Sequence, residues 1–106
     1  MIDWDRVEEL KDEVGEEDFA EVVTLFLGEV ADELATLDAT ADTATLRARL
    51  HFLKGSALNI GFAAFSELCR KSEVAAASDG PLSVDTKAIR SCFSASRAAL
   101  LEGLSE

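Results

Sequence analysis

Hydrophobic residues recur every three or four positions along most of the chain, which is the spacing of amphipathic α-helices. The stretch 16–38 is the clearest example, and its apolar face consists of Phe19, Val22, Val23, Phe26, Leu27, Val30, Leu34 and Leu37. A shorter helix precedes it, because Asp3 can cap a first turn and Gly15 marks an end. No alternating pattern typical of β-strands competes with these helices.

Further helices follow, separated by segments rich in capping and turn residues. The segment "DATADTAT" is a poor helix interior, so we expect a break there, with Asp42 or a neighbouring threonine opening a helix over about 43–60. Gly61 marks the end of that helix or a bend in it. The next helix runs to the turn "SDGPLS" at 78–83.

The last predicted helix covers about 84–104. Its expected buried face consists of Ile89, Cys92, Phe93, Leu100 and Leu104. Four long amphipathic helices can hide their apolar faces only against one another, and 106 residues suit one domain. The pattern therefore predicts an all-α fold over residues 1–106, an antiparallel four-helix bundle with a short additional N-terminal helix.

The net charge of −11 excludes nucleic acid as a partner, since binding a phosphate backbone requires a surplus of Lys and Arg. The charge is unevenly placed. Residues 1–39 carry 14 acids against two bases, for a net charge of −12, whereas residues 40–73 carry three acids against five bases, for a net charge of +2. Residues 74–106 come to −1, so the only histidine lies in the one segment that is not acidic.

Neither a signal peptide nor a membrane span is recognisable, because no stretch approaches the roughly 18 apolar residues that a span requires. We expect a cytoplasmic protein that does not bind membranes.

Cys69 and Cys92 lack a CxxC neighbour and fall on apolar faces, so we expect both to be buried and to behave as small hydrophobic residues. Each helix carries one apolar stripe with none left over, which favours a monomer.

The histidine lies away from the apolar stripe of the 43–60 helix. At about 100° per residue, the stripe stays within about 40° of the direction of Leu46. His51 falls at about 140°, Lys54 at about 80° and Gly55 at about 180° from the same direction. This helical wheel of residues 43–60 therefore predicts that His51 lies at the solvent-exposed edge of the bundle.

Gly55 is unexpected in this helix, because an interior glycine costs about 1 kcal/mol relative to alanine. Close packing against another helix is the usual structural reason, but Gly55 points away from the predicted core. One turn beyond His51, the missing side chain leaves space in which another macromolecule can approach the imidazole.

An exposed neutral imidazole is a nucleophile if one ring nitrogen has a free lone pair and the other holds the proton against an acceptor. Lys54 could offset the charge of a phosphoryl group on the ring, and Arg47 is a second candidate. Glu73 is the best candidate acceptor, because it lies about 40° from Cys69 on the flank of the next helix's buried face. Taken singly, each of these side chains could equally be an ordinary surface residue.

The stretch "HFLKGSALNIG" resembles the signature of histidine-containing phosphotransfer (HPt) domains, H-x-L-K-G-S followed by a glycine five residues later. The matching positions are His51, Leu53, Lys54, Gly55, Ser56 and Gly61. The resemblance implies a four-helix bundle over nearly the whole chain. It also implies phosphorylation of His51 on Nε2, with Lys54 beside the phosphoryl group and Gly55 opening the surface to the partner.

Many HPt domains also carry a Leu-Glu pair on the following helix, whose acid can hold the other ring nitrogen. Here "LCRKSEVA" supplies Glu73 but has Ser72 in place of the leucine. The resemblance further implies response-regulator receiver domains and a sensor histidine kinase as partners. Receivers supply their own Mg²⁺, so we expect this chain to need no cofactor.

The leading prediction is a relay intermediate that carries phosphoryl groups between receiver aspartates, because the chain has no glycine-rich nucleotide loop. One alternative is the phosphotransfer module of a chemotaxis-type histidine kinase, phosphorylated from ATP by a separate catalytic domain. A chain from Met1 to Glu106 without a trailing linker favours a free-standing protein.

The sequence is also compatible with a non-catalytic helical adaptor. A metal site of His51, Cys69 and Cys92 is the weakest hypothesis, because it lacks close ligand spacing.

Overall fold

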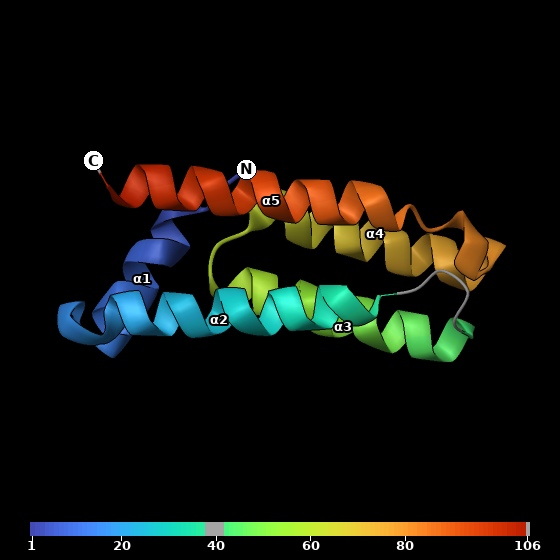
Figure 1. Ribbon diagram of the computed structural model, residues 1–106, viewed down its shortest axis with the longest axis horizontal. Coiled ribbons are helices and arrows are strands. Elements are labelled where there is room, and N and C mark those ends of the chain that lie inside the picture. The colour runs from blue at the N-terminus through green and yellow to red at the C-terminus, as the bar shows by residue number, and fades with distance from the viewer. Residues whose placement is uncertain (38–41, 106) are drawn as a thin grey trace.

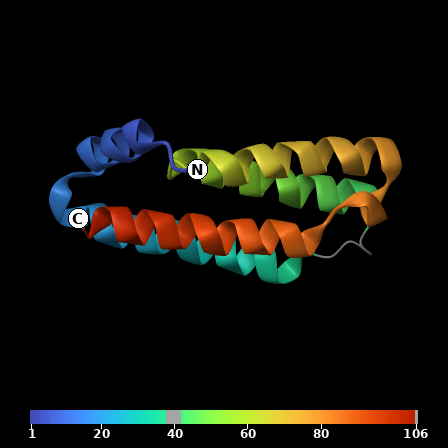
Figure 2. The same ribbon diagram turned by 90° about the horizontal axis from the view of Figure 1, so that it is seen from above.

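The computed structural model describes residues 1–37 and 42–105, and in these residues it is built from helices (Figure 1). They are α1 (Trp4–Val14), α2 (Glu16–Thr36), α3 (Thr43–Asn59), α4 (Ala63–Asp79), the 3₁₀-helix η1 (Pro81–Ser83) and α5 (Thr86–Leu104). Helices α2 to α5 alternate in direction and form an antiparallel bundle, and α1 lies at the end where α2 begins (Figure 2). The predicted four-helix bundle with a short additional N-terminal helix is confirmed.

Three helices begin at aspartate caps. Asp3, Asp42 and Asp85 each accept a hydrogen bond from the backbone N–H three residues later, at 3.2, 2.8 and 2.9 Å. The prediction that Asp42 opens a helix is confirmed, while residues 38–41 of the predicted break lie outside the described residues. In the described part of the chain, no helix is both long enough and apolar enough to cross a membrane.

The bundle consists of two helix pairs. Helices α3 and α4 pack closely along their length, and α2 and α5 form the opposite side (Figures 1 and 2). The stripe predicted for α3 is buried, since no residue of it is more than 1% exposed: Leu46, Leu50, Leu53, Ala57 and Ile60. The prediction for α5 is wrong at Leu104, which is 39% exposed because the last turn of α5 borders an open groove.

Gly61 forms the corner between α3 and α4. Its φ of +78° is the left-handed conformation that favours glycine, and its carbonyl accepts a 2.7 Å hydrogen bond from the N–H of Asp3. A Cβ at this position would lie 2.7 Å from the carbonyl oxygen of Asp3. The extended N-terminus also forms an isolated bridge between Ile2 and Phe62. A glycine is therefore required at position 61 both by the left-handed turn and by the N-terminal segment at Asp3, which packs against it.

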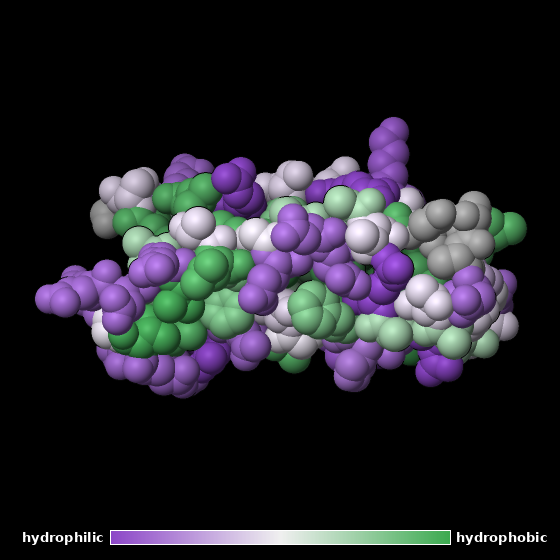
Figure 3. Space-filling model, turned by 60° about the horizontal axis from the view of Figure 1, so that its bottom comes forward, coloured by the Kyte–Doolittle hydropathy of each residue, from purple (hydrophilic) through white to green (hydrophobic). Residues whose placement is uncertain are grey.

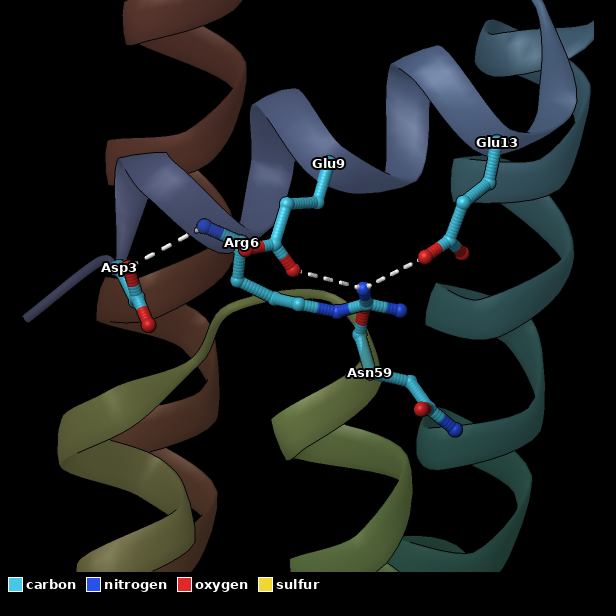
Figure 4. A network of polar contacts seen from close by, with 5 residues as sticks. All are labelled: Asp3, Arg6, Glu9, Glu13 and Asn59. Atoms are coloured by element: carbon cyan, nitrogen blue, oxygen red, sulfur yellow. Dashed lines mark hydrogen bonds and ion pairs between the residues drawn. The ribbon is translucent and has the colours of Figure 1, made fainter.

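Arg6 connects α1 to the end of α3 (Figure 4). Its Nε donates to the carbonyl oxygen of Asn59 at 3.1 Å, and its Nη1 lies 3.3 Å from Glu9 and 3.2 Å from Glu13. The two carboxylates hold the guanidinium in place and raise the pKa of Arg6 above its usual value, mainly through Glu13. This contact satisfies one of the carbonyl groups that a helix C-terminus leaves without a partner.

Candidate functional site

His51 projects from the outer face of α3, and 69% of its side chain is exposed. The neighbouring core residues Leu50 and Leu53 are completely buried on the other side of the helix. The 3.6-residue repeat of α3 separates the two faces, so a fully buried stripe leaves this ring at the surface. The structure thus places the imidazole where the wheel predicted it.

Glu73 approaches His51 from α4. Its Oε1 lies 3.4 Å from His51 Nδ1, and its Oε2 lies 3.7 Å from Lys54 Nζ. The side chains of Glu73 and Lys54 are only 19% and 26% exposed, so their positions are restricted by packing. A carboxylate beside Nδ1 favours the tautomer with its proton on that nitrogen. Nε2, on the far side of the ring, then has the free lone pair.

Ser72 occupies the position of the leucine that many HPt domains carry before the glutamate, and it lies at a buried position. Its side chain donates a 2.8 Å hydrogen bond to the carbonyl oxygen of Leu68, one turn earlier in α4. The buried hydroxyl therefore has a partner within its own helix, as buried polar groups require. This departure from the family pattern leaves Glu73 directed toward α3.

Gly55 is exposed on the turn of α3 that follows His51, and a Cβ there would have no neighbouring atom within 4 Å. No packing contact therefore requires a glycine at this position, unlike Gly61, where a Cβ would meet backbone. The absent side chain leaves a bare strip of helix backbone beside the imidazole.

Arg47 and the two cysteines stand apart from this cluster. Arg47 is exposed one turn before His51 and forms no ion pair with any described residue. Cys69 is fully buried in α4, and burial raises its pKa to about 12. Among the described residues, no three His, Cys, Asp or Glu side chains come close enough together to hold a metal ion. The structure therefore gives no support to a metal site of His51, Cys69 and Cys92.

Two apolar side chains near the site received no role from the sequence. Leu58 is 56% exposed and lies about 20° from His51 on the helical wheel of α3. Val74 follows Glu73 on α4 and is 55% exposed. The signal that could have identified them is the presence of apolar residues on the polar faces of both helices. Exposed apolar groups around a polar centre are typical of protein-binding surfaces.

The arrangement consists of an exposed imidazole, a carboxylate 3.4 Å from its Nδ1, a nearby ammonium group and an exposed glycine one turn away. The family model described as "Hpt domain" matches residues 21–105, which include α3, α4, α5 and most of α2. No curated protein and no solved structure matches the chain significantly. The chain therefore belongs to the Hpt domain family, the phosphotransfer modules of two-component systems.

Proposed function

We propose that this protein relays phosphoryl groups between aspartates of receiver domains, with His51 as the intermediate carrier. The single observation that supports this role best is the position of Glu73 Oε1, 3.4 Å from Nδ1 of a largely exposed imidazole. A carboxylate beside Nδ1 favours a proton on that nitrogen, which would leave Nε2 with the lone pair that a nucleophile needs.

In the forward step, the Nε2 lone pair attacks the phosphorus of the receiver's aspartyl phosphate. An N–P bond forms, the P–O bond to the aspartate breaks, and the aspartate leaves as a carboxylate. Nδ1 keeps its proton, so the phosphorylated ring becomes cationic. Glu73 stabilises that charge because its carboxylate already lies beside Nδ1. Attack by a second receiver's aspartate reverses the same bond changes.

Lys54 is the candidate partner of the phosphoryl oxygens. Its ammonium group lies 3.7 Å from Glu73 and is partly exposed, so rotation of its flexible stem can redirect it toward a group on Nε2. Arg47, one turn before His51, is a second source of positive charge. No metal ion is required from this chain, because the receiver brings the Mg²⁺ bound in its own acidic pocket.

The docking face consists of His51, Gly55, Leu58 and Val74. Gly55 admits the partner's backbone, and the two exposed apolar residues provide area that can be buried on contact. The net charge of +2 over residues 40–73 complements an acidic pocket, whereas the charge of −12 over residues 1–39 would repel it. Charge therefore favours docking over α3 and α4.

Label transfer from a phosphorylated receiver tests the relay. Wild type should accept one phosphoryl group and pass it to a second receiver, His51→Ala should accept none, and Glu73→Gln should be slower with its fold intact. Label that enters His51 only from ATP and a kinase catalytic domain, never from a receiver, would identify a kinase module instead. Equal label on wild type and His51→Ala would leave only the adaptor function.

A further inference from the structure

The side of the bundle opposite the α3–α4 pair is not closed. Between α2 and α5 lies a groove of about 840 Å³. Its floor is made by large apolar side chains, chiefly Phe19, Val23, Leu27, Phe93 and Leu101. The groove includes Leu101 and Leu104, so it reaches the end of the bundle where the C-terminus lies (Figure 1). Hydrophobic side chains also gather toward that end on the face shown in Figure 3. His51 belongs to α3 and is exposed, and α3 and α4 lie on the side of the bundle opposite α2 and α5 (Figure 2), so an occupant of the groove leaves His51 accessible.

Arg90 closes the other end of the seam between α2 and α5. Its Nη2 donates to the carbonyl oxygens of Leu34 and Leu37 at 2.9 and 2.7 Å, which fastens α5 to the end of α2. The groove is open from about Phe19 to Ala31, twelve residues farther along the helix. At 1.5 Å per residue this length is about 18 Å, enough for roughly three turns of another helix.

Small residues form the walls of the groove. They are Ala20, Thr24 and Gly28 on α2, and Ser94 and Ala98 on α5. A Cβ added at Gly28 would have no atom within 4 Å, so this wall is open to solvent. Because the side chains of the walls are small, the backbone of a partner helix can approach closely. Its own side chains can then reach the apolar floor, as in helix-in-groove recognition.

Charged residues in and beside the groove determine the chemistry of the occupant. Among the lining residues, Lys11 and Glu16 form a 3.9 Å ion pair, and Arg97 places a positive charge on the α5 wall. Helix α2 carries seven acids and no base, and Glu17 and Glu21 lie within about 60° of Thr24 on its helical wheel. They border the α2 wall and attract positive charge. A second copy is a poor occupant, because each chain has a net charge of −11 and would bring another acidic α2. A helix that is basic along its edge over α2, and not along its edge over Arg97, fits this distribution of charge.

We propose that the α2–α5 groove binds an amphipathic helix of a partner protein, about 12 residues long, with an apolar face and basic residues along the edge over α2. Leu or Phe side chains spaced at i, i+4, i+7 and i+11 fill the floor. Such a partner can hold the protein while the opposite face exchanges phosphoryl groups. The groove itself is independent of the phosphorelay.

A designed fluorescein-labelled peptide tests the groove with the full chain. The peptide carries Leu at i, i+4, i+7 and i+11, Lys along one edge and Gln along the other. Two controls have the same composition, one with the leucines dispersed and one with the Lys and Gln edges exchanged. Fluorescence anisotropy should give a Kd of about 1–100 µM for the first peptide, a range suited to a small interface. Each control should bind at least about tenfold more weakly.

Matched variants locate the binding site. Ala98→Phe fills the groove wall, whereas Ala95→Phe makes the same change at an exposed position of α5 outside the groove. Circular dichroism first establishes that both variants are folded. Ala98→Phe should weaken binding of the peptide at least about tenfold, and Ala95→Phe should leave it unchanged. The double variant Glu17→Lys, Glu21→Lys should weaken it at least about fivefold at low salt, because it reverses the charge of the α2 edge.

Several results would overturn the proposal. They are equal binding of the patterned and dispersed peptides, equal binding by the Ala98→Phe and Ala95→Phe variants, or no binding at 500 µM peptide, about five times the weakest expected Kd. Sedimentation equilibrium provides the remaining outcome. A wild-type dimer that Ala98→Phe dissociates would assign the groove to a second copy of the chain instead.

Discussion

Gly55 and Gly61 both belong to the signature, but the structure predicts opposite effects on stability when each is changed to alanine. At Gly55 a Cβ meets nothing, so Gly55→Ala should gain the usual helix-interior difference of about 0.5–1 kcal/mol. For a domain of this size, that gain raises Tm by about 2–8 °C. At Gly61 the left-handed φ of +78° costs alanine about 1–2 kcal/mol.

The chain that crosses Gly61 adds to this cost. A new Cβ would lie 2.7 Å from the Asp3 carbonyl oxygen, so the N-terminus must move and lose its 2.7 Å hydrogen bond to Gly61, worth about 1 kcal/mol. The total loss for Gly61→Ala is therefore about 2–3 kcal/mol. Urea denaturation followed by circular dichroism measures both variants against wild type.

The rate of phosphotransfer should also differ between the Gly55→Ala and Gly61→Ala variants. A methyl group added to a closely packed docking face costs about 1–3 kcal/mol, so Gly55→Ala should accept label from a receiver about 5- to 160-fold more slowly while being more stable. Folded Gly61→Ala should transfer at the wild-type rate. A Gly55→Ala protein that is less stable than wild type, or that transfers at full speed, would refute the argument that Gly55 serves docking.

Four further outcomes follow from individual contacts. Lys54→Ala should slow phosphotransfer about tenfold or more at unchanged stability, and an unchanged rate would remove Lys54 from the mechanism. Arg90→Ala should lower the free energy of unfolding by about 1–2 kcal/mol, measured by urea denaturation, because the carbonyls of Leu34 and Leu37 lose their donor. Cys69 should react with a thiol reagent far more slowly than the half-buried Cys92, because burial raises its pKa to about 12; equal rates in the folded protein would contradict this. Hydrogen bonds from Thr45 lower the pKa of Asp42 below 3.8, so the stability that wild type holds over Asp42→Ala should persist above pH 3.8 and decline as the pH falls further, as thermal melts would show.

Local periodicity was sufficient to predict the helices and the exposure of His51. The stripe from Leu46 to Ile60 fixes which side of α3 faces the core, and the direction of every other side chain on that helix follows from it. The wheel of the following helix placed Glu73 on the flank of its buried face, and the structure brings it within 3.4 Å of His51. Adjacent antiparallel helices joined by a tight corner make such a contact predictable.

Contacts between distant segments could not be predicted in this way. Periodicity assigns a face to each helix but does not say how far α2 and α5 separate, so the groove and the exposure of Leu104 were missed. The expectation that no apolar face is left over failed for the same reason. The crossing of Asp3 over Gly61 and the bond from Arg6 to Asn59 join the first helix to the far end of α3, and no local pattern encodes such pairings.

The proposed relay depends on Nε2 of His51 as the atom that carries the phosphoryl group. The most direct test is long-range ¹H–¹⁵N NMR of the ring after the protein has been phosphorylated by a phosphorylated receiver. We predict the phosphoryl group on Nε2 and a proton on Nδ1 facing Glu73. A phosphoryl group on Nδ1, or an unmodified His51 ring after the receiver has lost its phosphate to this protein, would rule out this mechanism.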